Sequence, residues 1–166
     1  MKPNTRNASR TDRELLRHTV ATLAYRGGKA FRDVPEGFAE FRVAETTRTP
    51  GQILAHIGDL IDWALAIAKG SHKWHNSKPL SWGKGVERFH QALHTLDNYL
   101  ASGAPLRFPT QSLFQGPIAD ALTHVGQISM LRRLAGSPVR GENYFRADIV
   151  SGRVGPRQSA PKLEFD

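Results

Sequence analysis

Apolar residues recur every three or four positions in four separate segments of this chain, which is the spacing of amphipathic α-helices. The clearest segment spans residues 50–69, where one stripe contains Ile53, Ile57, Leu60, Ala64 and Ile67. Strict alternation of apolar and polar residues, the pattern of a half-buried strand, is nowhere sustained. The sequence therefore predicts an all-α protein without a substantial sheet.

Residues typical of helix starts and helix ends flank these segments. Thr11 and Thr49 each stand three residues before a Glu or Gln, the form of a capping box. Glycines at 70, 103 and 136 follow the later segments, with prolines after two of them, and predict helix ends there. We expect helices beginning near residues 11, 50 and 117, the first with an end left open by Gly27 and Gly28. A further helix, reached by a loop with Pro79, is expected to contain the apolar positions from Val86 to Leu100. The lengths of these helices suit an antiparallel four-helix bundle.

A chain of 166 residues has room for one domain, spanning 1–166. The bundle is expected over about 11–136, with Phe38, Phe41 and Val43 of the connection 32–48 packed against it. Residues 137–166 are expected to form an irregular tail, rich in glycine and proline. This tail still carries large apolar side chains between residues 143 and 150, so we expect that stretch to form a short helix or turn packed on the bundle.

The formal net charge is +8, but the excess lies at the two ends of the chain. Residues 1–32 carry +6, residues 33–131 carry −1 and residues 132–166 carry +3. Charge alone is weak support for nucleic-acid binding, and no aromatic–basic interleaving or recognition motif accompanies it. We therefore do not expect a nucleic-acid partner.

The absence of cysteine excludes a disulfide scaffold, a thiolate zinc site and a cysteine nucleophile. No apolar run approaches the length of a membrane span, and the basic N-terminus lacks the apolar region of a signal peptide. A cytoplasmic location without membrane association is expected. Phosphate-binding loops, the G-x-S-x-G motif and the H-E-x-x-H motif are all missing.

With cysteine and the common catalytic motifs absent, the seven histidines are the main candidates for metal binding or acid–base catalysis. His56 borders the apolar stripe of the second helix, and His124 has the equivalent place on the fourth. Asp120 precedes His124 by four residues, so both side chains leave one helical face. Each residue alone is more often structural than functional. Together, two histidines and one carboxylate from facing helices predict a metal site with open positions.

The other histidines are weaker candidates. His90 and His94 have metal-ligand spacing on the third helix, but the flank they occupy is expected to be a solvated face. His72 and His75 fall in the polar stretch SHKWHNSK, and His18 is expected to be exposed on the first helix.

Two segments resemble the DinB/YfiT-like superfamily of metal-dependent enzymes. They are TPGQILAHIGDLIDWAL, residues 49–65, and GPIADALTHVGQISMLRRLAGSPV, residues 116–139. The most specific parts are the T-x-x-x-x-L-x-H-I start of the second helix and the H-x-G-Q-x-x-x-L-R-R pattern that begins at His124. The resemblance covers most of residues 11–139 and implies a four-helix bundle that holds a divalent metal ion, such as Zn, Ni, Mn or Fe.

The resemblance also implies the ligands: one histidine from the second helix and two, four residues apart, from the fourth. His56 and His124 match, whereas Asp120 stands where the family has a histidine. Two alternatives follow, and we favour the first: Asp120 is a genuine ligand, or the metal site has degenerated.

Relatives of this type imply a hydrolase, or a transferase or isomerase that uses a low-molecular-weight thiol and a small-molecule substrate. The competing hypothesis is a non-catalytic bundle with a degenerate metal site, either a stress-related binding protein or a homodimeric scaffold. No residue identifies the substrate or the general base.

Overall fold

The computed structural model describes residues 9–165, so the basic residues 1–8 and Asp166 lie outside the description. Its four long helices are α1 (Arg10–Phe31), α2 (Pro50–Ala68), α3 (Trp82–Ala101) and α5 (Ala119–Leu134). Its short elements are η1 (Phe38–Glu40), α4 (Thr110–Leu113), η2 (Phe114–Ile118), η3 (Tyr144–Arg146), β1 (Gly141–Glu142) and β2 (Glu164–Phe165). The predicted all-α class is confirmed: the described chain is mostly helical, with one antiparallel strand pair, β1 and β2.

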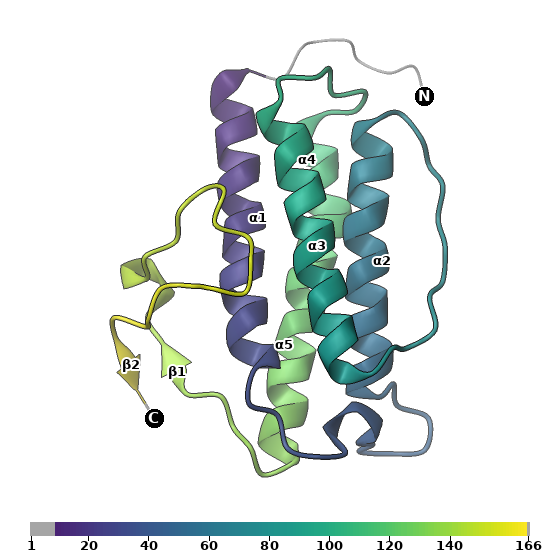
Figure 1. The fold of residues 1–166 in the computed structure, drawn as a ribbon, viewed down its shortest axis with the longest axis vertical. Helices are drawn as coiled ribbons and strands as arrows, with labels where there is room; N and C mark the ends of the chain where they lie inside the picture. Colours follow the sequence, from purple (N-terminus) through teal and green to yellow (C-terminus); the bar gives the residue numbers. More distant parts are fainter. Residues whose placement is uncertain (1–8, 166) are drawn as a thin grey trace.

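The long helices contact one another in the order α1–α3–α2–α5, and α5 contacts α1 (Figure 1). Their facing sides share one apolar core. The apolar stripe predicted for residues 50–69 is buried at every named position. Helix α2 also begins at the predicted residue, with Thr49 as its N-cap and Pro50 as its first residue. Thr49 and Gln52 cap each other's backbone N–H groups at 3.2 and 2.9 Å.

The four long helices do not alternate in direction as in the expected antiparallel bundle. Residues 69–81 run back along α2, so that α2 and α3 point the same way (Figure 1). Arg88 near the start of α3 accordingly bonds to the carbonyl of Ala55 near the start of α2. Arg13 of α1 bonds instead to the carbonyl of Leu100 at the far end of α3, which makes α1 and α3 antiparallel. The expected antiparallel order thus holds for some neighbours, and the long connection sets the others parallel.

Helix α1 begins before the predicted capping box at Thr11. Ser9 and Asp12 form the box instead, with each side chain accepting the other's backbone N–H. The helix also continues through Gly27 to Phe31. A Cβ atom at Gly27 would lie 2.6 Å from Cζ of Phe89, so this glycine permits close packing of α1 on α3.

The predicted start of the last helix near residue 117 is wrong by about two turns. Helical structure begins at Thr110 and reaches α5 through η2, a π-helical segment with Pro117 inside it. Proline lacks an N–H donor and crowds the preceding turn, and the wider π turn accommodates it without ending the helix. Asp120 therefore lies in the first turn of α5, directly after this segment.

The tail packs on the long helices through both apolar and polar groups, and Val154 is part of the apolar core. Glu142 of β1 is buried, where it accepts hydrogen bonds from Tyr25 at 2.6 Å and from Lys29 at 2.7 Å. The predicted short helix is η3, yet its Phe145 is 93% exposed. In the connection 32–48, Phe38 is buried and Phe41 packs on the core, whereas the expected packing of Val43 is wrong, because its side chain is exposed.

No helix within residues 9–165 is both long enough and apolar enough to cross a membrane.

Candidate metal centre

The three residues singled out from the sequence converge between α2 and α5. His56 extends from α2, and Asp120 and His124 extend from successive turns of α5. One ligand atom from each side chain lies within 4.8 Å of the other two. The two imidazole rings meet edge to face, with centroids 4.7 Å apart.

The separations of these atoms suit a small divalent cation. Asp120 Oδ1 lies 3.5 Å from His124 Nε2, and Asp120 Oδ2 lies 3.9 Å from His56 Nε2. Ligands bound tetrahedrally at about 2.0–2.1 Å from a zinc ion are about 3.3 Å apart. The side chains thus need only small movements to share one ion. His124 is 11% and Asp120 49% exposed, so the group is open on the side of the carboxylate.

Gln127 fixes the orientation of His124. Its Oε1 atom lies 2.8 Å from His124 Nδ1, and because an amide oxygen only accepts, this contact is a hydrogen bond in the tautomer with the proton on Nδ1. The lone pair is then on Nε2, the atom that faces Asp120. Such a partner on the far nitrogen is the usual support of a metal-bound histidine. Gln127 belongs to the H-x-G-Q pattern, but the spacing alone did not identify its role.

The surroundings of His56 keep its imidazole neutral. Burial lowers the pKa of His56, and the neighbouring His124 and Arg48 lower it further, against the opposing effect of Asp120 and Asp59. A neutral imidazole has a free lone pair at neutral pH, and this is the form that binds metal ions.

Asp59, Asp62 and His75 form a second group of this kind, which sequence reasoning missed. A guanidinium already fills its centre. Nη2 of Arg88 lies 2.7 Å from both carboxylates and 3.3 Å from His75 Nε2. Because a cation would compete with Arg88 for the same oxygens, we interpret this group as an ion-pair network.

The network also holds the connection between α2 and α3. The backbone N–H of Ser77 donates to Asp59 Oδ2 at 2.8 Å, which ties the connection to α2. Burial opposes ionisation of Asp59, but the hydrogen bonds from Ser77 and Arg88 and the charge of Arg88 outweigh it. The pKa of Asp59 is therefore lower than its ordinary value.

The remaining histidines lie elsewhere. The expectation of a solvated face for both His90 and His94 is wrong for His90, which the tail buries and whose Nδ1 lies 2.9 Å from the carbonyl oxygen of Val154. Burial lowers the pKa of His90, against the effect of this hydrogen bond. His94 and His18 are exposed, and His72 packs edge-on against Phe108.

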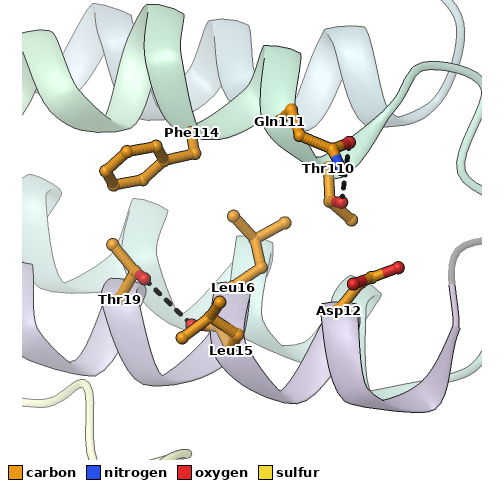
Figure 2. A pocket seen from close by; sticks show the side chains of 7 residues that line it. All are labelled: Asp12, Leu15, Leu16, Thr19, Thr110, Gln111 and Phe114. Atoms are coloured by element: carbon orange, nitrogen blue, oxygen red, sulfur yellow. Dashed lines mark hydrogen bonds between the residues drawn. The ribbon is translucent and has the colours of Figure 1, made fainter.

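A separate cavity of about 250 Å³ lies between α1 and the α4–η2 segment. Figure 2 shows its apolar side, made by Leu15, Leu16 and Phe114. Its two hydroxyl groups donate to protein oxygens: Thr19 to the Leu15 carbonyl and Thr110 to the Gln111 side chain. No histidine lines this cavity, so we do not place the chemistry there.

Comparison of the chain with family models, curated proteins and solved structures gave no significant match.

Proposed function

We propose that His56, Asp120 and His124 hold a divalent metal ion, and that the protein is a metal-dependent enzyme of the DinB-like type. The observation that carries this proposal is the convergence of two imidazoles and one carboxylate from α2 and α5 within 4.8 Å. Bundles commonly build metal sites from side chains of facing helices. The ring of contacts among the four long helices supports the finer assignment of a DinB-like four-helix bundle.

Three protein ligands leave coordination positions for water or a substrate atom. When bound, the ion would lower the pKa of a coordinated water or thiol and so supply a nucleophile at neutral pH. The chain's own residues would hold the ion, with Gln127 keeping Nε2 of His124 available. We propose a hydrolase or a low-molecular-weight-thiol transferase or isomerase acting on a small molecule.

Metal analysis of protein purified without a histidine tag tests the site. We expect about one equivalent of zinc, nickel, manganese or iron in the wild type, and its loss in His56→Ala and His124→Ala. The exposed His18 provides the matched control, because His18→Ala removes an imidazole on α1 and should leave the metal content unchanged. Unchanged metal content in both ligand variants would reject the site.

The variant Asp120→His distinguishes two hypotheses: that Asp120 is a metal ligand, and that the metal site has degenerated. This change restores the three-histidine set implied by the family resemblance. If Asp120 is a ligand, wild type and Asp120→His both bind zinc and Asp120→Ala binds it weakly. Binding by Asp120→His alone would instead show that the natural site has lost its metal.

A further inference from the structure

Trp74 is an aromatic residue in a polar stretch of the connection between α2 and α3, and it lies against the candidate metal centre. Its ring centroid is 5.6 Å from that of His56, with the planes at 69°. It lies equally close to Trp63 of α2, at 5.6 Å and 88°. The side chain is nevertheless 38% exposed, so it contacts a proposed ligand and solvent at once.

Anchors on both sides hold Trp74 in this place. Before it, the ring of His72 packs on Phe108 with centroids 4.8 Å apart. After it, Ser77 is bonded to Asp59 at 2.8 Å. The indole N–H of Trp74 donates to the side chain of Asn76 at 3.1 Å, which limits rotation of the ring. One ring contact and two hydrogen bonds therefore hold the connection and keep a partly exposed indole beside His56.

Trp63 extends this aromatic surface along α2. Residues 56 and 63 are two helical turns apart and share one face. The Nε1–H donor of Trp63 is buried and has no acceptor among residues 9–165. Buried donors are nearly always paired, so one left without an acceptor requires an explanation. This donor belongs to a ring that packs against Trp74, and Trp74 in turn lies against His56.

We propose that Trp74 and Trp63 form the aromatic wall of the substrate site beside His56, and that the substrate carries a planar aromatic group next to the atom that binds at the metal centre. Aromatic rings pair favourably edge to face or offset at centroid distances such as those between these side chains. The inference rests on the proposed function, because the wall matters only if His56, Asp120 and His124 bind a metal ion.

Two small chelators test the wall without knowledge of the substrate. Acetohydroxamate and benzohydroxamate bind zinc through the same pair of oxygens, but one carries a methyl group and the other a phenyl ring. We would measure their affinities for the zinc-loaded protein by titration calorimetry, in wild type, Trp74→Ala and Phe145→Ala. Phe145 is the control, because it is a strongly exposed aromatic residue of the tail.

In wild type we expect the preference for benzohydroxamate over acetohydroxamate to be about tenfold greater than in Trp74→Ala, equivalent to about 1.4 kcal/mol. Phe145→Ala should keep the wild-type preference, and all three proteins should bind zinc equally. Two results, each in protein that binds zinc, would contradict the proposed aromatic wall. One is an equal preference for benzohydroxamate over acetohydroxamate in wild type and Trp74→Ala, and the other is that neither hydroxamate binds. Failure of the wild type to bind zinc, nickel, manganese or iron would instead reject the proposed function.

Discussion

Replacing Arg88 by methionine tests whether the network around Asp59 is a structural ion pair. Methionine keeps an apolar stem of similar length and removes the guanidinium, which bonds to Asp59 and Asp62 and to the carbonyl of Ala55. The carboxylate of Asp59 is 3% exposed, so it would remain in the interior without its countercharge. The main cost should therefore come from Asp59.

The expected loss of stability can be worked from these contacts. Removing one partner of a buried ion pair costs about 3–5 kcal/mol, because the other charge is left uncompensated. Asp59 retains the hydrogen bond from Ser77, which favours the lower end of this range. Asp62 is 38% exposed, and a pair of that kind contributes about 0–1 kcal/mol. We expect Arg88→Met to lower the free energy of unfolding by about 3 kcal/mol.

Urea denaturation followed by circular dichroism at pH 7.5 measures this change. The matched control is Arg146→Met, which removes an exposed arginine of the tail and should change stability by less than about 0.5 kcal/mol. Adding Asp59→Asn to Arg88→Met removes the unpaired charge and should recover part of the loss. A loss below about 1 kcal/mol in Arg88→Met, which is the cost of an exposed pair, would show that Arg88 and Asp59 do not form a buried ion pair.

Three further predictions follow from other contacts. Gln127→Leu removes the acceptor for His124 Nδ1 and should weaken zinc binding about 10–100-fold, measured by competition with a chelator. Equal zinc affinity in the variant and the wild type would contradict the role assigned to Gln127. Gly27→Ala should destabilise the fold by about 1–2 kcal/mol, because the added Cβ atom would press on Phe89. Gly28→Ala should stabilise the fold by about 0.5–1 kcal/mol, because the atom nearest to its Cβ position is 3.7 Å away. Equal urea midpoints for the two variants would contradict this prediction. Because burial lowers the pKa of His90, its contribution to stability is intact above the ordinary histidine pKa of about 6.5 and is lost as pH falls below that value. His90→Gln should therefore flatten the dependence of the urea midpoint on pH between 8 and 5, whereas the exposed-site variant His94→Gln should not; a wild-type slope in His90→Gln would count against the prediction.

The sequence predicted features that depend on local spacing. Thr49, Pro50 and Gln52 start α2 where their side chains indicated, and the apolar stripe of this helix is buried throughout. The helical phase of His56 on α2 and of Asp120 and His124 on α5 placed all three beside apolar stripes. Because apolar stripes of packed helices face a common core, the three side chains could be expected to meet, and they do.

The features that were missed depend on contacts between distant parts of the chain. Lys29 and Glu142 pair across 113 positions, and no local pattern marks either as a buried residue. His90 is covered by the carbonyl of Val154 in the tail, which helical periodicity on α3 alone does not reveal. The start at Thr110 was missed because Pro117 reads as a helix start, and only the π-helical turn lets a helix pass through it.

Trp74 shows the same limit near the candidate site. The stretch SHKWHNSK reads as a polar connection, and the ring's place beside His56 depends on Phe108 and Asp59 from other parts of the chain. Likewise, Asp59 and Asp62 read as two acidic positions on α2 until Arg88 of α3 and His75 are placed beside them. Arrangement in space, rather than composition, distinguishes the two candidate metal groups.

An anomalous-scattering map, recorded from crystals at the absorption edges of zinc, nickel, iron and manganese, would show whether α2 and α5 hold a metal ion. We expect one peak within bonding distance, about 2.0–2.2 Å, of His56 Nε2, His124 Nε2 and a carboxylate oxygen of Asp120. We expect no peak among Asp59, Asp62 and His75, where Arg88 supplies the positive charge. No peak at the first group in metal-supplemented crystals, or a peak at the second group alone, would contradict the proposal that α2 and α5 hold the metal.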